Sequence, residues 1–205
     1  MLSFGRDQTT LRQDKYAIRQ RENSDSQAIY ELLNQPLCRQ GMLSDAFNSA
    51  AHFQSWVDNI DTNKFNIVAT HETVIVGFAG LFVYPENRKH VGWLALFVHE
   101  EFHNRGIGAL LMRVVIAAAD RVLKLRRVEL TVICENHRAI DLYRRFGLEI
   151  EGRHDCFARR ADEFVDVYTM SRIAEKMSRA GDDFTRRKQA AAFDSNSELQ
   201  TSAPL

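Results

Sequence analysis

Apolar residues recur along the chain with two spacings, one typical of helices and one typical of buried strands. From Ile107 to Val122 they fall at i, i+3, i+4, i+7, i+8, i+11 and i+15, which predicts a long amphipathic helix. The run from Val91 to Val98 is almost wholly apolar, as in a central strand buried on both faces. Residues 128–134 also have a strand pattern, so we expect a parallel strand–helix–strand unit with a right-handed crossover.

The rest of the pattern predicts further strands and helices around this unit. Strands are expected at 15–20, 65–70, 74–84, 148–152 and 164–173, and helices at about 24–35, 47–60 and 136–146. Ser24 and Gln27 have the spacing of a capping box, and Pro36 is expected to end that helix. Gly147 occupies the place of a left-handed C-cap. The element order predicts an α/β fold built on a mixed sheet.

A length of 205 residues suits a single domain, which we expect to cover residues 15–173. Residues 1–14 are polar and without periodicity, and residues 174–205 become polar and rich in small side chains. Both segments are predicted to be flexible or disordered tails, because they offer little apolar surface to offset the entropy of ordering.

Composition excludes several classes of partner. Lys+Arg and Asp+Glu are equal at 27 each, without a clustered basic face, so nucleic acid is disfavoured. Cys38, Cys134 and Cys156 form no CxxC pair, which predicts reduced thiols and no metal site. The N-terminus has no run typical of a signal peptide, and the apolar stretch 74–84 is shorter than the about 20 residues that span a bilayer. We therefore expect a cytoplasmic protein.

The loop between the buried strand and the long helix carries the most specific signal. Gly106 and Gly108 stand where that helix begins, and Arg105 precedes them. Glycine lets a ligand approach the unpaired N–H groups of a first helical turn, whose dipole favours phosphate. A glycine pair that serves only a tight turn is the alternative. The third glycine of a Rossmann fingerprint is missing, and the chain has no Walker A sequence.

The same loop resembles the R/Q-x-x-G-x-G/A signature of the GCN5-related N-acetyltransferases (GNAT superfamily), which binds the pyrophosphate of acetyl-CoA. Gly106 and Gly108 match it, and His103 stands where the family has Gln or Arg.

A second block resembles the family's N-x-x-A-x-x-x-Y-x-x-x-G-F helix. Asn136, Ala139, Tyr143 and Gly147 match it, and Leu148 replaces the usual Phe. The resemblance covers about residues 15–173. It implies a single-domain GNAT fold, with a mixed, mostly antiparallel sheet of six to seven strands, one central splayed parallel pair and about four flanking helices.

The resemblance also implies an N-acetyltransferase site with acetyl-CoA as co-substrate. Main-chain groups before the loop are expected to contact the pantetheine and thioester, and the loop and following helix the pyrophosphate. The residues concerned are Leu96, Phe97, Val98, His103, Asn104, Arg105, Gly106, Ile107, Gly108 and Ala109, together with Asn136 and Tyr143.

Two of these residues have implied catalytic roles. Tyr143 is expected to be the general acid that protonates the leaving thiolate, and packing in the helix's inner face is the alternative. Asn136 is expected to bind near the pantetheine, and it also suits an N-cap. Both roles of Asn136 can hold together.

No general base stands out. The strand before the loop reads GWLALFV and has no carboxylate, whereas Glu129, Glu135 and His90 flank the two parallel strands. Each of these is more typical of an exposed or already paired residue, and a water chain would also serve. Cys134 lies near the expected cleft without a paired histidine, so an inert thiol is favoured over an acyl-cysteine.

The acceptor is expected to be a small amine. The segment from Arg127 to Gly152, with 163–172, resembles bacterial L-amino acid N-acetyltransferases, although ribosomal-protein and polyamine acetyltransferases share much of it. Arg39 is a candidate partner for a substrate carboxylate, and the aromatic residues of the first helices suit either a pocket or the core: Phe47, Phe53 and Trp56. Acetylation of protein amines, and a CoA-binding module without catalysis, stay open, as does a homodimer.

Overall fold

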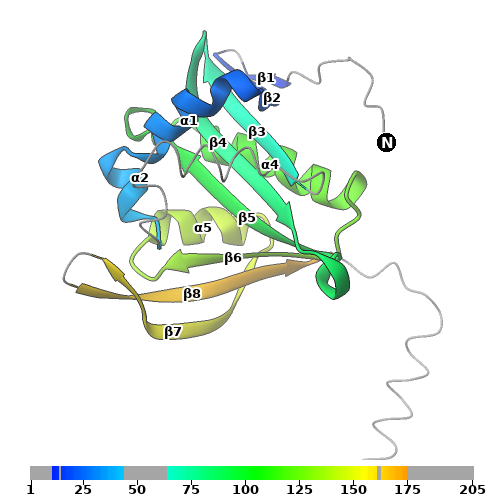
Figure 1. The fold of residues 1–205 in the computed structure, drawn as a ribbon, viewed down its shortest axis with the longest axis vertical. Helices are drawn as coiled ribbons and strands as arrows, with labels where there is room; N and C mark the ends of the chain where they lie inside the picture. The colour runs from blue at the N-terminus through cyan, green and yellow to red at the C-terminus, as the bar shows by residue number, and fades with distance from the viewer. Residues whose placement is uncertain (1–10, 14, 44–63, 161–162, 175–205) are drawn as a thin grey trace, which may run out of the picture. The chain divides into compact units, whose positions relative to one another are not determined.

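The computed structural model describes residues 11–13, 15–43, 64–160 and 163–174, which form one mixed sheet with helices on both faces (Figure 1). The strand order is β1-β2-β3-β4-β5-β6-β8-β7, and only the β5–β6 pair is parallel. The predicted fold class, with a single central parallel pair, is confirmed.

The strands are β1 (Leu11–Gln13), β2 (Tyr16–Gln20), β3 (Lys64–His71), β4 (Val74–Val83), β5 (Val91–Val98), β6 (Arg127–Ile133), β7 (Glu149–Arg160) and β8 (Glu163–Ile173). The described α-helices are α1 (Ser26–Leu33), α2 (Pro36–Gln40), α4 (Ile107–Arg121) and α5 (His137–Arg145). Short 3-10 turns occur at η1 (Asn23–Asp25), η2 (Glu86–Arg88) and η3 (Glu100–Phe102). No helix in these ranges combines the length and apolar character needed to cross a membrane.

The start of α1 differs from the prediction. The expected capping box at Ser24 and Gln27 is not formed, because the amide of Gln27 donates to Glu31. A capping box is formed one turn earlier, at η1, where the Asp25 carboxylate accepts the Glu22 N–H at 2.7 Å. Pro36 follows the end of α1 and also begins α2, a first-turn position where its missing N–H leaves no bond unmade.

The sheet is larger than predicted at both ends. The three-residue β1 pairs with β2, inside the segment predicted to be a tail. β7 continues to Arg160 instead of ending at Gly152, and it forms a long hairpin with β8. The predicted helix at 47–60 and nearly all of both predicted tails lie outside the described residues.

Two apolar clusters hold helices against opposite faces of the sheet. The larger contains Leu111, Met112 and Val115 of α4, all completely buried. The smaller contains Ile29 and Leu33 of α1, both almost completely buried. The helices α4 and α1 therefore cover opposite faces of the sheet that contains the β5–β6 pair.

The parallel strands separate along their length. Val91, Gly92 and Trp93 of β5 pair with Arg127, Val128 and Glu129 of β6, and the pairing ends there although both strands continue. Beyond this point β5 pairs only with β4, and β6 only with β8. The predicted splayed pair is thus present, and it opens toward the carboxyl ends of both strands.

Gly92 lies in the closed part of this pair, and close packing explains its identity. A Cβ atom there would lie 2.6 Å from Leu125 Cδ1 and 2.9 Å from Leu81 Cδ1. Both leucines are buried in the larger cluster. Only glycine lets these side chains cover the strand directly.

We expect Gly92→Ala to lower the free energy of unfolding by about 1–3 kcal/mol, because the added methyl overpacks a buried site. Urea denaturation measures the loss. Gly41→Ala is the matched control, since its Cβ would lie no closer than 3.4 Å to a neighbour. Equal stability of both variants would contradict the packing argument.

Candidate active site

Polar main-chain groups of β5 line the space between the separated strands. The His99 N–H donates to the Val76 carbonyl at 2.9 Å, and the Tyr84 N–H donates to Val91 at 3.1 Å. In an antiparallel pair these bonds alternate, so the odd-numbered residues of β5 face β4. Leu96 and Val98 therefore direct their N–H and C=O groups toward β6, into the opening.

Phe97 is placed differently from its two neighbours. It is paired with Phe78 of β4, so its main chain belongs to that ladder. Its side chain packs against the smaller apolar cluster. Of the three residues expected to contact the cofactor arm through the main chain, the structure brings two to the opening.

The carbonyl of Val98 accepts two bonds at the open end. His103 Nε2 lies 2.9 Å from it, and Cys38 Sγ of α2 lies 3.6 Å from it. Burial lowers the pKa of His103, which favours the neutral ring with its proton on Nε2. In this structure His103, at the family's Gln/Arg position, therefore binds the end of β5.

The start of α4 is shaped to hold an anion. Gly106 is its N-cap with φ 82°, a left-handed conformation that side chains disfavour, and a Cβ there would meet no atom within 4 Å. The first α4 hydrogen bond runs from the Leu110 N–H to Gly106 O at 3.0 Å. The amides of Ile107, Gly108 and Ala109 precede it, so they have no acceptor within the helix. A diphosphate fits these donors and the helix dipole.

Gly108 and Arg105 each make a packing contact that the sequence does not indicate. A Cβ on Gly108 would lie 3.0 Å from Leu142 Cδ2, so this glycine allows α4 and α5 to approach. The Arg105 guanidinium lies 4.9 Å from the centre of the Phe102 ring. That stacking holds the positive charge beside the start of α4. Asn104 also has a positive φ, 60°, and completes the turn.

Asn136 and Tyr143 both lie on α5, and each shows the structural role that the sequence left open. Asn136 Oδ1 accepts the Ala139 N–H at 3.2 Å, so it caps the helix. Its Nδ2 lies 3.8 Å from the position of a Cβ on Gly41, which turns the amide toward α2. Tyr143 is 7% exposed and belongs to the larger apolar cluster. Burial raises its pKa to about 12, so its hydroxyl remains a proton donor.

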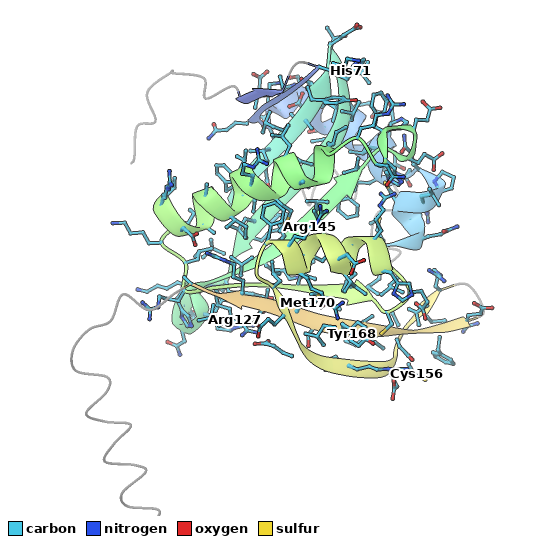
Figure 2. All side chains as sticks on the ribbon, turned by 180° about the vertical axis from the view of Figure 1, so that it is seen from behind. His71, Arg127, Arg145, Cys156, Tyr168 and Met170 are labelled. Carbon is cyan, nitrogen blue, oxygen red and sulfur yellow. The ribbon has the colours of Figure 1, made fainter. Side chains whose placement is uncertain are left out.

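Of the three candidate bases, Glu129 is already paired and lies at the closed end of the β5–β6 pair. Glu129 is bound by Arg127 and Arg88, each at 2.6 Å. Burial acts to raise the pKa of Glu129, but these hydrogen bonds lower it overall. Arg127, which holds Glu129, lies at the closed end of the β5–β6 pair, far along the sheet from Cys156 (Figure 2). His90 and Glu135 are exposed.

The thiols near the opening are poor nucleophiles. Burial raises the pKa of Cys134, and it raises that of Cys38 to about 11. Both are therefore thiols at neutral pH, which does not favour an acyl-cysteine. The part of the chain that the structure describes contains no group of three or more metal-binding side chains.

Sequence reasoning missed two residues at the open end. Cys38 was read only as a free thiol, although it contacts β5, and Glu100 was not singled out, although it binds α2. Their partners are about 60 residues away in the sequence. No local spacing could have indicated either contact.

A parallel pair that opens beside an anion-binding helix start defines an enzyme that binds a long thioester cofactor with a diphosphate. The model of the Acetyltransferase (GNAT) family matches residues 26–148, and the chain belongs to this family. It is an N-acetyltransferase that uses acetyl-CoA as co-substrate and acts on an amine.

Two curated relatives differ in their named acceptors. The L-amino acid N-acetyltransferase AaaT of Escherichia coli (strain K12) is 33% identical over 157 residues, which cover 76% of this chain and 96% of the relative. The spermine/spermidine N(1)-acetyltransferase of Bacillus subtilis (strain 168) is 31% identical over 90 residues, covering 42% and 59%.

Solved structures share the fold. An acetyltransferase of the GNAT family from Streptococcus pneumoniae has a TM-score of 0.65 and 26% identity, covering 78% of this chain and all of that one. The yncA acetyltransferase from Salmonella typhimurium, solved with acetyl-CoA, has a TM-score of 0.72 and 16% identity, covering 80% and 98%.

We expect Gly106→Ala to weaken CoA binding about tenfold. A side chain in the left-handed conformation costs about 1–2 kcal/mol, and a loss of 1.4 kcal/mol in binding is a factor of ten. Titration calorimetry with CoA measures the change. Gly152→Ala is the control, because its Cβ would make ordinary contacts at 3.4 Å. Unchanged affinity in Gly106→Ala would contradict the role given to this turn.

Proposed function

We propose that this enzyme acetylates the primary amine of a free L-amino acid by direct attack in a ternary complex. The opening between β5 and β6 supports direct transfer, because it lets a thioester on one side meet an acceptor on the other. The relative that matches nearly its whole length to this chain is named for L-amino acids, which supports the acceptor class.

The residues at the opening divide the chemistry between them. Acetyl-CoA supplies the activated acetyl group as a thioester. The N–H groups of Leu96 and Val98 are in position to donate to the thioester oxygen, where negative charge develops as the amine attacks. The C–N bond forms and the C–S bond breaks, so the sulfur leaves with the electron pair.

We assign protonation of that sulfur to Tyr143. A phenol with a pKa of about 12 transfers its proton only to a strong base. A buried site makes a released thiolate more basic than it is in water, because burial disfavours the charged form. Donor and acceptor therefore become matched inside the site, although they are not matched in solvent.

Two protons leave the acceptor nitrogen in this scheme: the ammonium proton passes to water before attack, and the proton lost as the amide forms restores the phenol of Tyr143. Glu129 is already held by two arginines, and its lowered pKa makes it a weak base. A peptide α-amino group has an ordinary pKa near 8, and that of a free amino acid is higher because of its carboxylate, so a minor fraction is neutral at pH 7 to 8. An amino acid acceptor thus needs less assistance than a lysine or polyamine amine with a pKa near 10.4.

The compartment is proposed on chemical grounds. The three cysteines are free thiols, one of them buried, which suits the reducing cytoplasm.

A thiol-release screen with acetyl-CoA tests the acceptor class. We expect free L-amino acids to give turnover and spermidine to give a kcat/KM value at least tenfold lower, because the proposed base-free route favours amines of lower pKa. Intersecting double-reciprocal lines are expected for a ternary complex. Parallel lines, or a clear preference for polyamines, would reject the proposal.

Tyr143→Phe tests the proton donor. General acid catalysis contributes about 10²–10⁴-fold, so we expect kcat to fall by about 10²-fold, with CoA affinity retained. In the wild type, kcat should show no loss from Tyr143 ionisation below about pH 11, since its pKa is about 12. Tyr16→Phe removes only a distant hydroxyl and should leave kcat unchanged. A Tyr143→Phe variant with wild-type kcat would assign Tyr143 to packing.

A further inference from the structure

The short helix α2 lies across the open end of the parallel pair, and its first turn is bound to the loop that follows β5 (Figure 1). Glu100 Oε2 accepts the Leu37 N–H at 3.4 Å. In return, the Glu100 N–H donates to Gln35 Oε1 at 3.1 Å. Glu100 belongs to η3, just before the diphosphate-binding turn, yet its carboxylate is directed to α2.

The other end of α2 is bound to the β7–β8 hairpin. The Arg160 guanidinium donates to the Gln40 carbonyl at 2.9 Å. Leu43, just past the helix, packs against Ile133 of β6 and Val165 and Val167 of β8. The helix is therefore attached on both sides of the opening, to the β5 side through Glu100 and to the β6 side through Arg160.

The middle of α2 faces the opening itself. Cys38 is 7% exposed and its sulfur contacts the Val98 carbonyl, one of the main-chain groups that point into the gap. Gly41, at the end of the helix, lies beside the Asn136 amide. This surface lies on the same side of the sheet as α1, opposite α4.

A helix of five residues cannot hold itself in place, because isolated helices shorter than about 12 residues are marginal in water. Its position therefore depends on the buried Cys38 and on the contacts at its two ends. We propose that Glu100 and Arg160 are positioning residues that hold α2 across the opening, on the side from which the amine of the proposed reaction enters. Through Glu100, a residue of the acetyl-CoA loop controls the binding of the amine.

This inference rests on the proposed function only in that an amine enters on the α2 side. It assigns to Glu100 an effect that the position of this residue does not suggest. The position next to the diphosphate turn suggests an effect on acetyl-CoA, whereas the contacts assign the effect to the second substrate.

Steady-state kinetics of Glu100→Ala test the link. We expect the KM for the amine to rise at least fivefold, with the KM for acetyl-CoA and the Kd for CoA within twofold of wild type. Glu101→Ala is the matched control, because Glu101 is the exposed neighbour in the same turn. Glu100→Gln keeps an oxygen acceptor for Leu37 and should restore most of the affinity. Arg160→Ala should raise the same KM, and Arg160→Lys should restore it in part.

Alkylation of Cys38 gives a readout that needs no activity. With N-ethylmaleimide and mass spectrometry, we expect Cys38 to react at least fivefold faster in Glu100→Ala and Arg160→Ala than in wild type or Glu101→Ala. The exposed Cys156 serves as internal reference. Failure of every amine to react would reject the proposed function while labelling still tests α2. Unchanged labelling, or a rise confined to the acetyl-CoA KM, would overturn the inference.

Discussion

The separation of β5 from β6 is the feature on which the rest of the site depends. A sheet that opens exposes main-chain N–H and C=O groups, which is costly unless they find partners. This opening is sustained because each strand keeps its outer neighbour, β5 with β4 and β6 with β8 along its whole length. Polar groups are thus free of the ladder on one side only, where a thioester and an amine can use them.

The two ends of the opening are held by different kinds of interaction. At the closed end, Arg127 binds Glu129 and Glu151, and Arg88 also binds Glu129. This network ties η2, β6 and β7 together where the strands still pair. At the open end, hydrogen bonds hold a helix of five residues. The strands that form the opening therefore lie beside a short helix, α2, whose position depends on a few contacts.

The signature loop illustrates how one motif combines unrelated physical requirements. Gly106 is needed for its left-handed backbone, and Gly108 for the contact between α4 and Leu142. His103 binds the end of β5, and Arg105 is stacked on Phe102. Phe102 in turn contacts Tyr16 of β2, His71 of β3 and His99, the N-cap of its own 3-10 turn. Conformation, packing and charge thus all converge on the same short segment.

The sequence by itself determined the elements whose cause is local. The apolar spacing from Ile107 to Val122, the unbroken strand before it and the Asn136 cap are consequences of periodicity and turn chemistry, and all are present in the structure. The family resemblance also indicated that the parallel pair separates. Tertiary structure alone decided that Glu129 is paired with two arginines. It also decided that Cys38 and Glu100 join α2 to β5 and to the turn after it. Those contacts join side chains and main-chain groups that are distant in sequence, and a pattern read along the chain carries no information about which of them meet.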